Sequence, residues 1–173
     1  MSASRATFEA ALDDLGVTVS STVPAELPAH LSEVVTPPAV GVPPDGVFDR
    51  PESALAETPI EADPTPAAVR EAATGVTGAD LGVADYGSLV LTPTGQGSEL
   101  ISLFPDRHVA VVRASDILDD MDAAVEAIDE RTAAAGGSAI IATGPSATAD
   151  MGALVRGVHG PESVHVVIVE GDD

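Results

Sequence analysis

Hydrophobic and polar positions follow a helical period at the start of the chain. Within residues 4–15, Phe8, Leu12 and Leu15 fall on one face at spacings of three and four residues. This spacing predicts an amphipathic helix, for which Gly16 is a natural stop.

Residues 17–21 read VTVSS and predict a short strand, after which proline breaks the pattern. Most of the 14 prolines lie within residues 23–66, and proline interrupts both helices and central strands. We therefore expect only short elements there, namely a helical turn over 28–34 and a strand over 39–42. A short helix is expected again near 66–73.

The second half of the chain alternates short apolar runs with glycine-rich turns. Strands are predicted over 81–84, 88–91, 108–112, 138–142 and 164–169. Helical segments separate the later strands, and this alternation predicts an α/β fold with a mostly parallel sheet.

One long helix is predicted over 116–134, with Ser115 as its cap and Gly136 after its end. Acidic residues cover its outer face. The residues of its expected buried stripe are Ile117, Met121, Ala124, Val125 and Ile128. A second, short helical segment is expected from about Thr148.

Composition supports this fold class. A length of 173 residues suits one domain, and 45 % of the residues are hydrophobic while only 2 % are aromatic. The core must then be built from Val, Ile, Leu and Ala, which favours buried parallel strands packed against helices.

Charge is the strongest feature of the composition. Twenty-eight acidic residues face seven basic ones, all arginine, and the formal net charge is −21. An acidic surface adapted to a salt-rich cytoplasm, as in halophilic proteins, an acidic patch for a basic partner and a mesophilic outlier all fit this excess. Nucleic acid is not expected as a partner, because its phosphates require positive charge.

Further function classes are excluded by what the sequence lacks. There is no cysteine, so a disulfide, a catalytic thiol or a cysteine-ligated cluster cannot form within this chain. The four histidines show no metal-binding spacing, so no metal site is predicted. No apolar run is long enough to span a membrane and no signal peptide is evident, so we expect a cytoplasmic protein.

The segment IIATGPSATADM, residues 140–151, is the first candidate for chemistry. Hydroxyl groups of Thr143, Ser146 and Thr148 surround a turn at Gly144, and a helix beginning there would offer backbone N–H groups to an anion. The segment lacks the lysine of a Walker loop and the glycine spacing of a hydrolase elbow. A plain strand-to-helix turn with Ser146 as its cap explains the same residues.

Two further segments carry candidate residues. In RGVHGPESVHV, His159 stands on a glycine-rich loop beside Gly160, where it fits either a ligand contact or a turn that binds its own backbone. In GVADYGSLVL, Asp85 and Ser88 bracket a turn, which suits either a polar ligand or an ordinary hairpin. His165 alternates with valines and is expected to be structural.

Taken in order, the segments GVTGADLGVADYGSLVL, LFPDRHVAVV, TGPSATADM and GVHGPESVHVVIVE resemble the LUD domain of the lactate-utilisation protein C family. The resemblance covers about residues 73–170, and residues 1–72 look like a shortened, proline-rich first half of one domain, 1–173. It implies a Rossmann-like sandwich of the sugar-phosphate isomerase and CoA-transferase type.

The resemblance also implies a role. Bacterial members of the family belong to a three-protein system that oxidises L-lactate to pyruvate, in which the partner proteins carry the iron–sulfur clusters. We expect an accessory subunit without a cofactor of its own, which binds a small anionic metabolite or docks iron–sulfur subunits, and which can form a homo-oligomer. The rival hypotheses are a stand-alone enzyme of the isomerase or CoA-transferase type and a regulatory ligand-binding module.

The sequence departs from the family pattern at two places. Ala147 stands where the family often has arginine, so Arg156 or Arg107 would have to supply the charge for an anion. Asp85 and Tyr86 replace a glutamate and a threonine. The expected ligand-binding residues are Asp85, Ser88, Thr143, Gly144, Ser146, Thr148, Asp150, His159 and Gly160, and no catalytic residue can be assigned.

Overall fold

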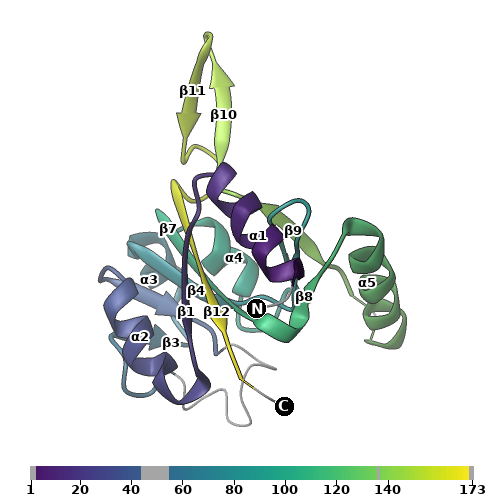
Figure 1. Cartoon of the computed structure of the whole chain (residues 1–173). Helices are drawn as coiled ribbons and strands as arrows, with labels where there is room; N and C mark the ends of the chain where they lie inside the picture. The colour runs from purple at the N-terminus through teal and green to yellow at the C-terminus, as the bar shows by residue number, and fades with distance from the viewer. Residues whose placement is uncertain (1–2, 44–54, 136, 172–173) are drawn as a thin grey trace.

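The computed structural model describes residues 3–43, 55–135 and 137–171. Its centre is a six-stranded sheet in which every neighbouring pair of strands is parallel (Figure 1). In sheet order the strands are β1 (Thr18–Thr22), β12 (Ser163–Val169), β7 (Arg107–Arg113), β4 (Thr74–Gly78), β2 (Ala39–Gly41) and β3 (Ile60–Ala62). The predicted mostly parallel α/β fold is confirmed.

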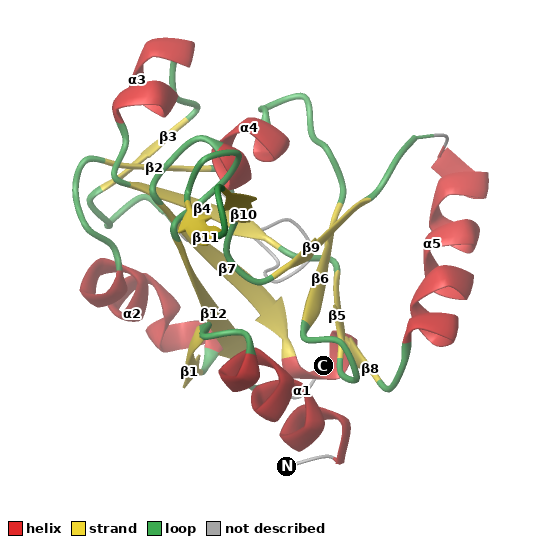
Figure 2. Cartoon of the chain, turned by 90° about the horizontal axis from the view of Figure 1, so that it is seen from above, coloured by secondary structure: helices red, strands yellow, loops and turns green. Residues whose placement is uncertain are grey.

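A second sheet of four strands packs against one face of the first, on the side that Figure 2 shows to the right. Its strands, in order, are β8 (Ile117–Leu118), β5 (Leu81–Val83), β6 (Ser88–Leu91) and β9 (Ile140–Thr143). Only the β5–β8 pair is parallel. The sequence predicted three of these strands but not their separation into a sheet of their own.

Helices cover the remaining faces of the two sheets. They are α1 (Ala3–Asp14), α2 (Leu27–Val34), α3 (Pro66–Glu71), α4 (Ser98–Leu103) and α5 (Met121–Ala135), with 3-10 turns at Pro24–Glu26 and Ala114–Asp116. Helix α1 joins the core between the two sheets, α2 packs on the opposite face of the larger sheet, and α5 packs outside the smaller one (Figure 2).

The larger core lies between the sheets and is built from aliphatic side chains and one aromatic residue, Phe8. Strand β7 shows why the sequence forms a buried parallel strand, since its five central residues are all buried. Alternate residues serve opposite faces, so Val109 and Val111 pack with α2 while Ala110 and Val112 pack between the sheets.

The predicted helix over 116–134 is wrong at its start. The chain forms a 3-10 turn and the short strand β8 first, so Ile117 pairs with Gly82 in the sheet instead of beginning a helix. The helix begins at Met121, where the Ala123 amide donates to Asp120 Oδ1 at 2.9 Å. Asp120 thus replaces Ser115 as the capping side chain.

The delayed start rotates the helix relative to the expected stripe. Ala124 is fully buried, as predicted, whereas the side chain of Val125 is 53 % exposed. Met121 and Ile128 pack partly against the smaller sheet. Three of the four predicted positions within α5 are therefore correct, and Val125 is not.

Strand β4 and helix α4 were not predicted, and Gly75 explains how they fit together. A Cβ atom at Gly75 would lie 2.1 Å from the backbone oxygen of Ile101, so α4 approaches β4 more closely than any side chain allows. The first four residues of β4 (TGVTG) are all buried, but its glycine and threonine residues do not form the apolar run that predicts a strand.

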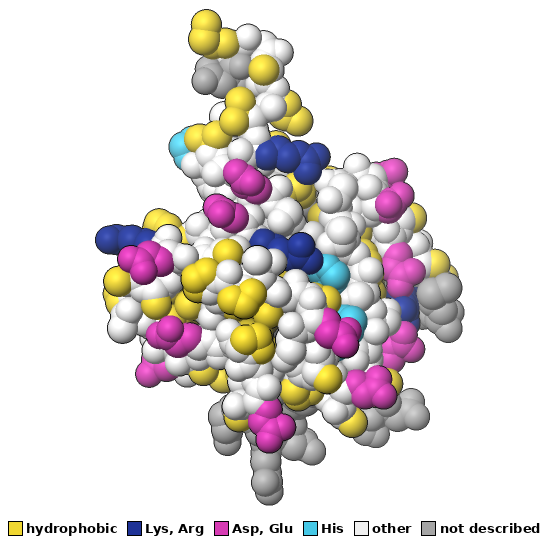
Figure 3. All heavy atoms as spheres, turned by 90° about the vertical axis from the view of Figure 1, so that its left-hand side faces the viewer, with side chains coloured by type: hydrophobic (Ala, Val, Ile, Leu, Met, Phe, Trp, Pro, Cys, Tyr) yellow, Lys and Arg dark blue, Asp and Glu magenta, His cyan; other side chains and the backbone are white. Residues whose placement is uncertain are grey.

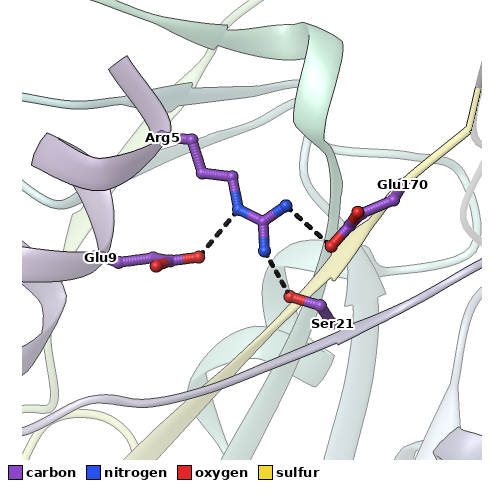
Figure 4. A network of polar contacts seen from close by, with 4 residues as sticks. All are labelled: Arg5, Glu9, Ser21 and Glu170. Carbon is purple, nitrogen blue, oxygen red and sulfur yellow. Dashed lines mark hydrogen bonds and ion pairs between the residues drawn. The ribbon is translucent and has the colours of Figure 1, made fainter. Parts of the chain in front are cut away.

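The larger sheet is fastened at one edge by Arg5 from α1 (Figure 4). Its guanidinium contacts Glu9 at 2.8 Å and Glu170 at 2.7 Å, and it donates to Ser21 Oγ on β1. The hydrogen bonds to Glu9 and then to Glu170 raise the pKa of Arg5.

In the described part of the chain, no helix is long and apolar enough to cross a membrane.

Candidate functional site

A cavity of about 320 Å³ lies where the two sheets, α1, α4 and two glycine-rich loops meet. Its apolar wall includes Leu12 from α1, Leu89 from β6 and Val164 from β12. The residues of its wall that carry polar side chains are Ser102, His108, Thr143, Ser146, Thr148 and His159. The cavity therefore combines an apolar lining with a few hydrogen-bonding groups, as small-molecule sites do.

Backbone hydrogen bonds join the two glycine-rich loops to each other. The Ser146 amide donates to the Pro161 carbonyl at 2.9 Å, and the Gly157 amide donates to the Ser146 carbonyl at 3.1 Å. The His159 amide donates to Ser146 Oγ at 3.3 Å. Residues 144–146 and 157–161 thus form one structural unit at the cavity, although the sequence presented them as two separate candidates.

Glycine is required where these loops approach their neighbours. Gly144 has φ of +66°, a left-handed conformation that favours glycine, and a Cβ atom there would lie 3.3 Å from Leu15 Cβ. At Gly160 a Cβ atom would lie 3.2 Å from Ser146 Cβ. The loops pack tightly enough that a methyl group at either glycine would displace a wall residue.

Thr143 is positioned by the smaller sheet. It ends β9 opposite Ser88 of β6, and the two hydroxyl oxygens are 2.7 Å apart. Ser88 is buried and does not line the cavity, so it supports Thr143 instead of facing a ligand.

The short helical segment predicted from Thr148 is wrong. Residues Ala147–Asp150 and Ala153–Arg156 form an antiparallel hairpin, β10 and β11, that projects from the body as an arm (Figure 1). Met151 and Gly152 connect its strands and both have positive φ, as in the two-residue turns that match strand twist. Because no helix begins there, Ser146 caps none and the expected helix-terminal anion site does not exist.

His108 is a buried wall residue that the sequence did not predict. Its side chain is 3 % exposed, and its Nε2 atom lies 2.8 Å from Thr77 Oγ1 on β4. Burial lowers the pKa of His108 from 6.5 to about 4, so the imidazole is neutral at physiological pH. Among the described residues, its Nδ1 atom has no hydrogen-bond partner. Strand alternation could have found it, because His108 must face away from Arg107.

No charged residue other than histidine lies in the described wall of the cavity. Asp85 is exposed in the turn after β5, where its amide donates to the Asp119 carbonyl at 3.3 Å. Asp150 belongs to β10. Arg156 is exposed on β11 and reaches toward Gly16, while Arg107 contacts His165 on the other sheet face.

The structure thus brings together six of the nine expected residues around one cavity, namely Thr143, Gly144, Ser146, Thr148, His159 and Gly160. It adds Ser102 and His108, and it leaves Asp85 and Ser88 outside the wall, while the side chain of Asp150 lies outside the described part of the structure. Within the described ranges, no three His, Asp or Glu residues are grouped so that they could hold a metal ion. Fold and cavity together define an α/β protein with a small, uncharged polar site beside a projecting hairpin.

Comparison with known proteins identifies the family. The sequence profile of the LUD domain matches residues 13–169, so the chain belongs to the LUD domain family. A crystal structure of a DUF162 family protein from Deinococcus radiodurans shares the fold, with a TM-score of 0.71 over 96 % of both chains and 22 % sequence identity.

Curated relatives carry a more specific name. The chain is 33 % identical over 96 residues to lactate utilization protein C of Deinococcus radiodurans. It is 34 % identical over 102 residues to the protein of the same name from Bacillus licheniformis. These alignments include 54 % and 56 % of this chain but only 45 % and 42 % of the two relatives, so the matched part is less than half of each relative.

Proposed function

We propose that this LUD domain acts in L-lactate utilisation as a ligand-binding and partner-docking subunit without an iron–sulfur cluster of its own. The observation that carries the proposal is the joining of the TGPS and GVHGP loops at one cavity. The similarity to lactate utilization protein C supports the metabolic role. The lack of cysteine is consistent with clusters held by partner subunits.

The cavity suits a small polar metabolite of the size of lactate or pyruvate. Hydroxyl groups of Thr143, Ser146 and Thr148 can donate to a carboxylate or carbonyl oxygen, and neutral His108 can donate or accept. Since no cation lines the described wall, a carboxylate would be stabilised by neutral hydrogen-bond donors in a partly open, weakly polar space. The rival enzyme of the CoA-transferase type needs a carboxylate or lysine, but the chain has no lysine and the described residues of the wall include no carboxylate.

The hairpin arm provides a docking element next to the cavity. All four residues of β11 are exposed, and the exposed apolar side chains of the arm are Met151, Leu154 and Val155. Met151 is completely exposed and has φ of +46°, a conformation in which most residues other than glycine and asparagine are strained. Apolar side chains exposed on a projecting arm, one of them in a strained conformation, support the proposed docking role of this hairpin.

Ligand binding is tested by calorimetric titration of the chain with L-lactate and with pyruvate. We expect saturable binding of at least one of them, weakened about tenfold by Thr143→Val or Ser146→Ala through loss of a donor. Thr7→Val, at an exposed position on α1, is the matched control and should bind normally. Absence of binding of both metabolites to the wild-type chain would refute the proposed site.

Docking is tested by affinity purification from cells grown on L-lactate. The wild-type chain should retain proteins whose visible absorbance shows iron–sulfur clusters, and Met151→Asn should lose them. Asparagine suits the left-handed turn better than methionine, so this variant removes the apolar contact without weakening the hairpin. Val125→Gln, which changes a half-exposed apolar residue on α5, should retain the partners.

The metabolic role has its own test. A strain in which the gene for this chain is deleted, and which has no second copy, should fail to grow on L-lactate as its sole carbon source. Normal growth would reject the role in lactate utilisation, whatever the cavity binds.

A further inference from the structure

A second cluster of polar side chains lies on the face of the larger sheet that is opposite to the cavity. Thr18 and Ser20 of β1 lie on the same face of the sheet as His165 of β12 and Arg107 of β7. Thr18 pairs with His165, which pairs with Val109, and Val109 is two residues from Arg107 on the same strand. His30 joins them from α2, which packs on this face. Arg107 and His108 are neighbours in sequence, yet they serve opposite faces of the sheet.

The hydrogen bonds of this cluster have one consistent direction. Arg107 Nη2 lies 3.1 Å from His165 Nδ1, and a guanidinium can only donate, so His165 Nδ1 accepts. His165 Nε2 therefore carries the proton and donates to Ser20 Oγ at 2.7 Å. The Ser20 hydroxyl then donates to His30 Nε2, also at 2.7 Å. The Thr18 hydroxyl oxygen lies 2.8 Å from His165 Nδ1 and 3.4 Å from the Val164 carbonyl oxygen, and its single proton can be donated to either.

Arg107 is the unusual member of this cluster, because its charge is unmatched. The chain has 28 acidic residues, yet among the described residues no carboxylate lies within 4.0 Å of the Arg107 guanidinium. Its only hydrogen bond there is to a neutral imidazole, and its Nε atom is buried without an acceptor. Arg5, by contrast, contacts two carboxylates. A partly buried guanidinium without a counter-charge is unfavourable, so Arg107 lacks an anionic partner.

Arg107 and most of its neighbours in the cluster are accessible to solvent. Arg107 is partly exposed, Thr18 is exposed, and Ser20 is partly exposed. Figure 3, which views this side of the molecule, shows cationic and histidine side chains next to one another on the surface, with acidic side chains around them. Asp106 and Glu162, the nearest acids along the sequence, are exposed to solvent.

We propose that Arg107, His165 and Thr18 form a second binding site, for the carboxylate or phosphate group of a small ligand. The planar guanidinium supplies donors that match an oxyanion, and the Thr18 hydroxyl can turn from His165 to a bound oxygen. His30 and Ser20 hold the His165 ring in place. The site does not share any residue with the cavity. Whether or not an anion binds here, the test of the proposed function in the cavity is therefore unaffected.

The test is a titration of the full chain with sodium phosphate and, separately, with sodium acetate at constant pH and ionic strength. The imidazole NMR signals of His165 and His30 report binding, and the chain has only four histidines to assign. We expect saturating shifts of both rings with at least one anion. The anion that saturates them decides between phosphate and carboxylate as the recognised group.

Variants separate this site from general ionic effects. Arg107→Gln should abolish saturation and Arg107→Lys should weaken binding about tenfold, since lysine keeps the charge but loses the fork of donors. Arg70→Gln, at an exposed position on α3, should bind as the wild type does. If Arg107→Gln fails to fold, Thr18→Val provides the test and should weaken binding several-fold.

The proposal is overturned if both anions give shifts that grow linearly without saturation in the wild-type chain. It is equally overturned if Arg70→Gln and Arg107→Gln reduce the shifts to the same extent, because the response would then reflect overall charge.

Discussion

Ser146 and His159 are 13 residues apart in the sequence, and the His159 amide donates to Ser146 Oγ at 3.3 Å. This contact lies at the base of the β10–β11 arm and beside the cavity, where it joins the two glycine-rich loops. The order of the cavity wall and the attachment of the arm therefore depend on the same small set of hydrogen bonds.

Replacement of Ser146 by alanine should loosen this junction locally. The variant loses one acceptor, which costs about 1 kcal/mol, while the backbone bonds of Ser146 to Pro161 and Gly157 remain. We expect faster hydrogen exchange of the His159 amide with little change in melting temperature. Ser32→Ala removes a comparable single bond in α2 and should leave the exchange at His159 unchanged.

Replacement of Gly75 by alanine should destabilise the whole domain. The added methyl group would lie 2.1 Å from the Ile101 carbonyl oxygen, so α4 must move away from β4. We expect the free energy of unfolding, measured by urea denaturation, to fall by about 3 kcal/mol. At Gly95 a Cβ atom meets nothing within 4 Å, so stability should change little in Gly95→Ala. Equal losses in the two variants would contradict this account of α4.

The rotation of α5 can be measured with two neighbouring substitutions. Ala124→Gln places a polar side chain at a fully buried position and should lower the free energy of unfolding by about 2 kcal/mol. Val125→Gln, at a position that is 53 % exposed, should be nearly neutral. A larger loss of stability in Val125→Gln than in Ala124→Gln would contradict this orientation of α5.

Burial of His108 predicts a loss of stability in mild acid. The folded imidazole takes up a proton only near pH 4, whereas in the unfolded chain it does so near its ordinary pKa of 6.5. Between these values the unfolded chain binds more protons, so the free energy of unfolding falls as the pH falls through this window. The contribution of His108 is complete above pH 6.5, and its loss amounts to about 3 kcal/mol near pH 4.

Two measurements check the His108 prediction. NMR titration should show the His108 ring neutral until the pH approaches 4. Urea denaturation should show the free energy of unfolding falling between pH 6.5 and 4. Burial, Arg107 and His30 likewise lower the pKa of His165 to about 4, so its ring should also stay neutral until the pH approaches 4. A His108 ring that titrates at its ordinary pKa would show that the imidazole is not enclosed.

The net charge of −21 predicts a fold that depends on salt, if the acidic surface is adapted to a salt-rich cytoplasm. Far-UV circular dichroism should report loss of structure when the chain is dialysed from molar KCl into dilute buffer, because screening of self-repulsion is removed. A control dialysis at constant KCl should preserve the spectrum. A spectrum indifferent to salt would leave a basic partner or a mesophilic origin as the explanation.

The family, the parallel sheet and six of the residues that line the cavity were predictable from the sequence. Runs of valine and isoleucine specify buried strands, and the order of the glycine-rich motifs identifies the LUD domain. These features are local, since each depends on a residue type and its immediate neighbours. The prediction of α1 was accurate for the same reason, because Phe8 and Leu12 repeat at helical spacing and are both buried.

Tertiary structure decided the conformation of segments whose local sequence suits either a helix or a strand. The segment after Ser146 has the hydroxyl and acidic residues of a helix start, yet Met151 and Gly152 turn it into a hairpin whose strands pair only with each other. Ile117 suited a helical stripe, but pairing with Gly82 placed it in a strand. The approach of Ser146 to His159, and of Arg107 to His165, joins residues 13 and 58 positions apart. Such contacts depend on the packing of whole elements, which no short sequence pattern encodes.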